Sequence, residues 1–347
     1  MRKISDELSN KIANMGFVCA CLVVCYHAPT NGMFITTWIK GVLGKIAVPV
    51  FFVISGFLLG VHVNEDGWYR DAIRKRVRTL VIPFFALNIL WFPIKYGIHF
   101  IAVRWFGASD ASNSMNLTLY NFFYYTGILP WGDNVVVGLW YVKALFILVC
   151  ISPLLVFLTR RRFVLLLVGW LSLLALWCLQ MGYEWPTKFL ERKMHYELGA
   201  MNFLYFSIGL FISQCRRIRL PWLVWCVTGV VAVLIWRFQI QSWQNLYWRT
   251  AAQFAVIVIV ALALWSVMPS AAWPKVMVKN SFPVFVLHGI VFFFVGLLSK
   301  ILGLGRALFD FWGGIPVVVM SIMLIICVAQ GLKHYFPRFS TVIFGGR

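Results

Sequence analysis

Charged residues are scarce in this chain. Asp, Glu, Lys and Arg make up 12% of its 347 residues, against about 25% in soluble globular proteins. Acidic residues are the rarer kind, with 11 Asp and Glu against 31 Lys and Arg. No polar stretch is long enough to build a separate soluble domain, and no Gly/Ser linker or internal repeat divides the chain. We therefore predict a single domain over residues 1–347.

Metal and disulfide patterns are also missing. The eight cysteines show no C-x-x-C spacing and lie within or beside apolar runs, where they serve as small packing residues. The net charge of +20 does not indicate nucleic-acid binding, because no RNP-like or zinc-finger pattern accompanies the basic residues. These lie in short segments between apolar runs, where they set membrane orientation and suit an anionic lipid surface.

Hydrophobic residues fill the chain instead, at 61%. The apolar runs predict an all-α polytopic membrane protein with about ten transmembrane helices. The distribution of Lys and Arg places both termini in the cytoplasm. Residues 104–134 are polar and aromatic, and a re-entrant or interfacial segment is an alternative to a simple loop there. The predicted spans are 12–28, 42–62, 80–103, 135–158, 163–182, 197–214, 220–238, 249–268, 282–302 and 313–333.

One histidine ends the first predicted span. An imidazole within a membrane-length helix is costly to place, so it indicates function. From Ile12 to His27 the helix rises roughly 22 Å, toward the outer part of the bilayer. A neutral imidazole is suited to taking a proton from a hydroxyl near neutral pH. The alternative is an interfacial histidine at a helix end.

A basic cluster, Arg74-Lys75-Arg76-Val77-Arg78, follows the second predicted span. Arginine presents a planar fork that matches phosphate oxygens, so the cluster is a candidate site for a phosphate-bearing donor. On its own, the cluster is explained better as an ordinary positive-inside cluster that binds lipid headgroups, since such clusters are common.

Five motifs along the chain belong together. They are Tyr26-His27-Ala28, the run from Pro49 to Leu59, the basic turn that leads to Pro83, Leu139-Trp140-Tyr141-Val142-Lys143-Ala144-Leu145, and Val286-Leu287-His288-Gly289. In this order they resemble the integral-membrane acyltransferase family 3, the bacterial O-acyltransferases.

This resemblance implies about ten helices and transfer of an acyl group, often acetyl, from cytoplasmic acyl-CoA to a hydroxyl of a carbohydrate or related acceptor. It also implies that His27 is the essential first-helix histidine and that Arg74, Arg76 and Arg78 lie on the CoA side. Many family members carry an arginine eleven residues before this histidine, where this chain has Gly16.

Lys143 is our candidate for the missing cation, since it falls inside the span 135–158. Snorkelling of its ammonium to an interface is the alternative. Glu197, at the outer loop, is predicted to bind the acceptor or to orient His27. Trp140 and Tyr141 are predicted to contact the acceptor. His288 is predicted to contact the donor, and a polar packing role is equally open to it.

The sequence thus predicts an acyl-CoA-dependent O-acyltransferase of a bacterial inner membrane that modifies an envelope carbohydrate. Acyl-CoA is the co-substrate, no metal is expected, and membrane lipids are the surroundings; a homo-oligomer is compatible with the sequence. The alternative is a transporter or flippase for an acyl-bearing or anionic metabolite. Helix breaks at Pro83 and Pro93 fit that alternative weakly, and no inverted repeat supports it.

Overall fold

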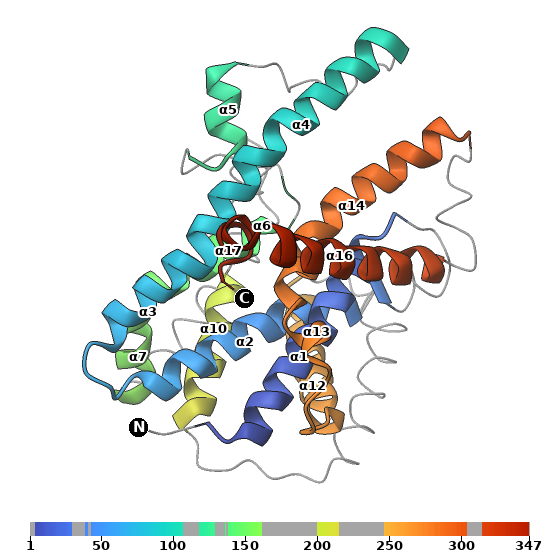
Figure 1. Cartoon of the computed structure of the whole chain (residues 1–347). Coiled ribbons are helices and arrows are strands. Elements are labelled where there is room, and N and C mark those ends of the chain that lie inside the picture. Colours follow the sequence, from blue (N-terminus) through green and yellow to red (C-terminus); the bar gives the residue numbers. More distant parts are fainter. Residues whose placement is uncertain are drawn as a thin grey trace.

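The computed structural model describes residues 4–29, 39–40, 43–106, 118–128, 136, 138–161, 200–214, 246–303 and 314–346. Within these ranges the chain is helical and contains no strand. Figure 1 shows the helices in a bundle, with α16 crossing over α14. The elements are α1 (Asp6–His27), α2 (Gly44–His62), α3 (Trp68–Arg76), the π-helical turn η2 (Val77–Val81), α4 (Ile82–Phe106), α5 (Leu119–Tyr125), α6 (Leu139–Cys150), α7 (Ser152–Arg161), α10 (Ala200–Gln214), α12 (Leu246–Val267), α13 (Lys275–Val278), α14 (Ser281–Ile301), α16 (Ile315–Tyr335) and α17 (Pro337–Phe344).

Five of the described helices are long and apolar enough to cross a membrane. A sixth span is possible if the bent pair α6 and α7 is counted as one. The chain is therefore a multi-pass membrane protein. The predicted spans 163–182 and 220–238 lie outside the described residues. The five candidate spans are Asp6–His27, Gly44–His62, Trp68–Ile98, Ser281–Ser299 and Ile315–Tyr335.

The basic cluster after α2 is helical, whereas the sequence predicted a turn. Helix α3 continues through η2 into α4, so that Trp68–Ile98 forms one candidate span of 31 residues. The widened turn of η2 comes just before Pro83. Proline has no N–H to bond the carbonyl four residues earlier, and a π-helical turn lets the helix continue past that missing bond. The arginines therefore occupy defined faces of a helix.

The span predicted over 135–158 is broken. Helices α6 and α7 meet at an angle of 61°. Pro153 lacks the N–H that would reach the Val149 carbonyl, and the Ser152 hydroxyl donates to that carbonyl instead, at 2.7 Å. This substitute hydrogen bond satisfies the backbone at the bend.

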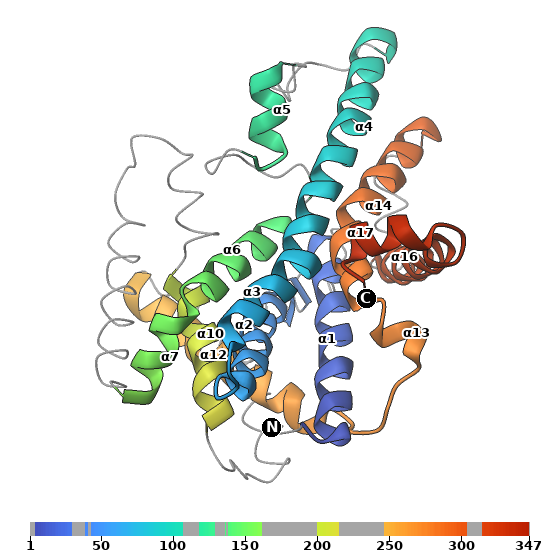
Figure 2. The same ribbon diagram turned by 60° about the vertical axis from the view of Figure 1, so that its left-hand side comes forward.

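The polar interval 104–134 contains the end of α4 and, among the described residues, one further helix, α5. It packs beside α4, where the rings of Phe92 and Phe122 lie 5.5 Å apart. Figure 2 shows α5 standing apart from the rest of the bundle, next to the far end of α4. Its Leu119 and Tyr120 side chains are exposed, as an interfacial segment would have them.

Glycines bring α2 and α10 into backbone contact. A side-chain carbon added at Gly56 would collide with the Phe206 carbonyl oxygen of α10. A side-chain carbon at Gly209 would likewise collide with the Val53 carbonyl oxygen of α2. Small residues at a crossing allow the close van der Waals packing that drives helix association in lipid. This crossing fixes α2, which carries one wall of the candidate site.

Helix α1 is fastened to the segment between α12 and α14. The Asn14 side-chain amide donates to the carbonyls of Pro269 and Ala271, at 3.0 and 2.9 Å. Phe17 packs edge-on against Trp273, with ring centroids 6.4 Å apart. These contacts fix the height of α1 relative to the start of α14, and hence which of their residues meet.

Candidate active site

Two histidines from distant parts of the chain form a pair. His27 ends α1, and His288 lies in the second turn of α14. Their rings stack with centroids 5.0 Å apart and planes 28° apart. Tyr26 packs edge-on against His27, with centroids 5.0 Å apart. His27 is half-buried and His288 is fully buried. The sequence predicted a role for each histidine but not that they meet.

The pair lies near the start of α14. His288 is about 10 Å along the axis from Ser281, where α14 begins. The sequence alone suggested that His27 lies far from the N-terminal side, because α1 is long. However, Asn14 is level with the segment that precedes α14, so the first turns of α1 extend below that segment. The distance along the bundle from His27 to the level where α14 begins is therefore shorter than the full length of α1.

The hydrogen bonding of His288 decides which of its ring nitrogens carries the proton. Nδ1 lies 2.6 Å from the backbone carbonyl oxygen of Phe285. A carbonyl only accepts, so Nδ1 carries the hydrogen and donates it, and Nε2 of the neutral ring presents a lone pair. Nε2 is buried and has no hydrogen-bond partner among the described residues. A buried acceptor of this kind accepts a hydrogen bond from a bound group or from an ordered water.

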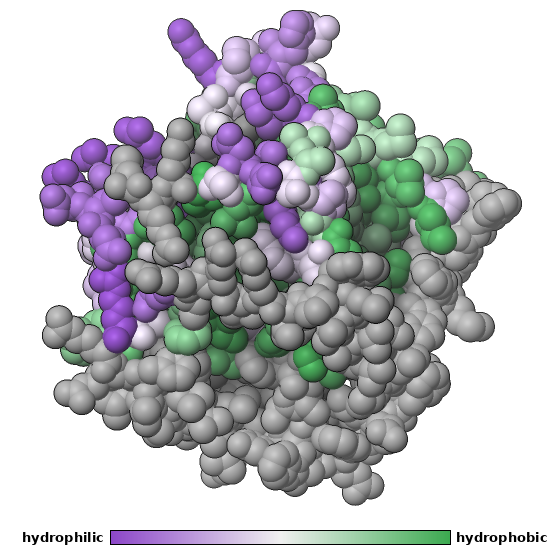
Figure 3. Space-filling view, turned by 90° about the horizontal axis from the view of Figure 1, so that it is seen from below, coloured by the Kyte–Doolittle hydropathy of each residue, from purple (hydrophilic) through white to green (hydrophobic). Residues whose placement is uncertain are grey.

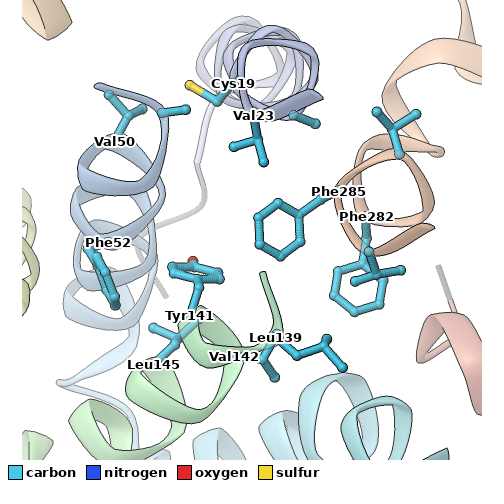
Figure 4. Close-up of a cluster of buried hydrophobic side chains, with 14 of the residues drawn as sticks. Cys19, Val23, Val50, Phe52, Leu139, Tyr141, Val142, Leu145, Phe282 and Phe285 are labelled. Atoms are coloured by element: carbon cyan, nitrogen blue, oxygen red, sulfur yellow. The ribbon is translucent and has the colours of Figure 1, made fainter. Parts of the chain in front are cut away.

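An aromatic cluster adjoins the histidine pair. Figure 4 shows Tyr141 of α6 and Phe285 of α14 facing each other in the space enclosed by α1, α2, α6 and α14. Their ring centroids are 5.5 Å apart. Phe51 of α2 contacts both rings, at 5.7 Å from Tyr141 and 5.8 Å from Phe285. Phe285 in turn lies 6.3 Å from His288. Rings from three helices thus pack beside the pair.

The start of α6 also reaches His288. Gly138 precedes α6 with a φ of 92°, a left-handed conformation that favours glycine. A side-chain carbon there would lie 3.5 Å from Cε1 of His288 and 3.6 Å from the Phe285 ring. The sequence reasoning missed this glycine and Phe285. The available signals were a glycine directly before an apolar helix and an aromatic residue one turn before the histidine.

The three predicted donor arginines do not share one face. Arg76 is half-buried and interacts electrostatically with Tyr141, a member of the aromatic cluster. Arg74 and Arg78 are one turn apart, exposed, and line a separate cavity of about 500 Å³. Tyr69 fastens α3 to the end of α6 by donating to the Cys150 carbonyl at 2.8 Å. A continuous helix therefore carries one half-buried arginine and two exposed ones.

A second candidate cation, in addition to the predicted Lys143, lies near His27. The Lys40 ammonium, between α1 and α2, interacts electrostatically with the His27 ring. Burial lowers the pKa of Lys40 from its ordinary value. Lys143 is half-buried in α6 and lies about 200° around that helix from Tyr141, the residue that faces the cluster.

The remaining predicted positions are distributed as follows. Trp140 is half-buried in α6 beside Tyr141. Glu197 lies outside the described residues. A side-chain carbon added at Gly16 meets no atom within 4 Å, so the place of the family arginine is open. Lys11 is occupied elsewhere, with its ammonium 5.0 Å from the centre of the Trp265 ring.

A membrane-embedded helical bundle that brings two histidines, an aromatic cluster and a basic helix together has the parts of a group-transfer enzyme. The chain belongs to acyltransferase family 3, since the family model for this acyltransferase domain matches residues 14–333. The resemblance inferred from the motifs is confirmed, and the protein is a membrane acyltransferase. No curated protein and no solved structure matches the chain.

Proposed function

We propose that this acyltransferase moves an acyl group, often acetyl, from cytoplasmic acyl-CoA to a hydroxyl of an envelope carbohydrate. The observation that carries the proposal is the series of ring contacts from Tyr141 through Phe285 to the histidine pair, together with the electrostatic interaction of Arg76 with Tyr141. It joins a basic helix suited to a phosphate-bearing donor with imidazoles suited to proton transfer. The adenine nucleotide end docks at the basic helix, and the pantetheine arm extends toward His288.

His27 acts as the general base. It takes the proton from the acceptor hydroxyl, whose oxygen attacks the carbonyl carbon of the thioester. The carbon–sulfur bond then breaks, and CoA leaves as a thiolate that takes the proton back from His27. His288 holds the donor, because its Nε2 lone pair accepts a hydrogen bond from an amide N–H of the pantetheine arm. His27 thus acts on the acceptor hydroxyl, whereas His288 binds the pantetheine arm of the donor.

A cation stabilises the negative charge that develops on the thioester oxygen. The electrostatic interaction of Lys40 with His27 supports giving this role to Lys40. Lys143 is the alternative that the sequence suggests. Trp140, Tyr141 and Glu197 contact the acceptor in this proposal. The protein works in a bacterial inner membrane among lipids, and its reaction needs no metal.

The test uses the purified protein in nanodiscs with radiolabelled acetyl-CoA and envelope glycans extracted from cells that lack it. We expect label in the glycan fraction and mass spectrometry to show an added acetyl group. His27→Ala should abolish transfer and leave membrane insertion intact. His62→Ala is the matched control, because His62 is an exposed histidine that pairs with Glu65 at the end of α2. Full activity of His27→Ala would overturn the role of His27.

A further inference from the structure

The cavity beside Arg74 and Arg78 has two walls from opposite ends of the sequence. Helix α3 and η2 form the first wall, and α17 with the glycines that follow it forms the second. Figure 1 shows α17 and the C-terminus lying against the junction of α3 and α4. The cavity volume, about 500 Å³, is within the range of about 300–1,000 Å³ of small-molecule sites. The sequence reasoning assigned no role to this C-terminal segment.

Packing holds the second wall in place. Phe344 is fully buried, and Ile343 is nearly so. After them the chain turns at Gly345, whose φ is 65°. A side-chain carbon at Gly345 would lie 2.7 Å from the Thr79 Cα atom of η2, so the two backbones approach closely. The C-terminal segment is thus a fixed part of the bundle and defines the shape of the cavity.

The first wall is strongly basic. Arg74, Lys75 and Arg78 line it together with one carboxylate, that of Asp71. Within the described ranges, none of the three cations forms an ion pair. Figure 3 shows the molecule from below the view of Figure 1, where hydrophilic residues gather on one side of the face beside a hydrophobic area. Unpaired cations around a cavity of this size suit phosphate oxygens.

We propose that the C-terminal helix α17 completes the site that binds the phosphate groups of the donor nucleotide. Arg74 and Arg78 bind the phosphates, while Val342 and Gly345 form the opposite wall and set how far the nucleotide enters. The inference rests on the proposed acyl-CoA donor. A lipid headgroup carries the same phosphate chemistry, and the experiment distinguishes these two sources.

The test places a negative charge on the second wall. Val342 lines the cavity and is 45% exposed, whereas Phe339 on the same helix is 44% exposed and lies outside the cavity. Val342→Glu and Phe339→Glu therefore add the same charge at equal exposure. Val342→Gln adds similar bulk without charge. The probe is adenosine 3′,5′-bisphosphate, with its dissociation constant measured on full-length protein in phosphatidylcholine nanodiscs.

We expect Val342→Glu to weaken bisphosphate binding by about tenfold or more, because its carboxylate repels the phosphates and competes for the arginines. Phe339→Glu should bind as the wild type does. A comparable loss in Val342→Gln also supports the site, since bulk there blocks it. Equal affinities of Val342→Glu and wild type would overturn the proposal, as would equal losses in the two Glu variants.

Native mass spectrometry of retained phosphatidylglycerol tests whether the cavity binds a lipid headgroup instead. Loss of this lipid in Val342→Glu with unchanged bisphosphate binding would assign the cavity to a headgroup and overturn the donor site. The transfer assay separates this inference from the proposed function. If the variants bind the bisphosphate with the expected pattern but the protein transfers no acyl group, the proposed binding site is supported and the proposed function is refuted. A wild-type KM for acyl-CoA in active Val342→Glu would refute the site alone.

Discussion

The unsatisfied Nε2 atom of His288 leads to a prediction that separates donor binding from chemistry. His288→Asn should keep the hydrogen bond to the Phe285 carbonyl, because an asparagine amide nitrogen takes a place similar to Nδ1. It removes the Nε2 acceptor. His288→Gln does the reverse, since a glutamine carbonyl oxygen reaches the Nε2 position. The two variants therefore test the two ring nitrogens of His288 one at a time.

The magnitude follows from burial. His288 is fully buried and its Nδ1–H bond is already made, so a donor amide that binds Nε2 loses a partner entirely in His288→Asn. Leaving a buried polar group unpaired costs about 1–3 kcal/mol, which corresponds to roughly 5- to 150-fold in KM for acyl-CoA. The kcat should change little, because the proton is transferred at His27.

The assay is steady-state transfer of radiolabelled acetyl groups over a range of acetyl-CoA concentrations. His288→Gln should recover much of the affinity that His288→Asn loses. His27→Ala provides the contrast, with a kcat lower by about 10²- to 10⁴-fold, the usual contribution of a general base. A fall in kcat without a change in KM for His288→Asn would refute the donor-binding role. Identical kinetics of the Asn and Gln variants would refute the importance of Nε2.

Three further predictions concern cations and packing. Lys40→Met should lower kcat, whereas Lys40→Arg should retain it. Burial lowers the pKa of Lys40, so this lysine loses its charge at a lower pH than an ordinary lysine does. Because arginine keeps its charge, Lys40→Arg should extend activity to higher pH. A larger kcat loss in Lys143→Met than in Lys40→Met would favour Lys143 instead. Gly16→Arg should fold normally, since a side-chain carbon at position 16 meets no neighbouring atom. If an arginine there positions the donor, this variant should have a KM for acyl-CoA that is several-fold lower. An unchanged KM would contradict that role of the arginine. Gly56→Ala should destabilise the protein by about 1–3 kcal/mol through overpacking, seen by tryptophan fluorescence as a lower unfolding temperature. Gly331→Ala should leave the unfolding temperature unchanged, because a side-chain carbon there meets no atom within 4 Å. Equal unfolding temperatures of the two variants would refute the close α2–α10 crossing.

The helices themselves follow from the sequence wherever apolar runs are long. The predicted spans 42–62, 282–302 and 313–333 correspond closely to α2, α14 and α16, because burial in lipid requires a continuous apolar helix. The bend between α6 and α7 depended on a single proline within an otherwise apolar run. The number of spans and the cytoplasmic location of the termini stay predictions.

Residue chemistry by itself singled out His27, His288 and the arginines, since polar groups within apolar helices are expensive and therefore few. It had no means of showing which of them meet. The stacking of His27 on His288 depends on the Asn14 contacts that set the height of α1. The placement of Arg78 one turn after Arg74 depends on the helix continuing from α3 into η2. Such pairings arise from contacts between segments far apart in the chain, where local pattern carries no information. The sequence determined the kinds of groups available for acyl transfer, and the packing of helices decided their partners.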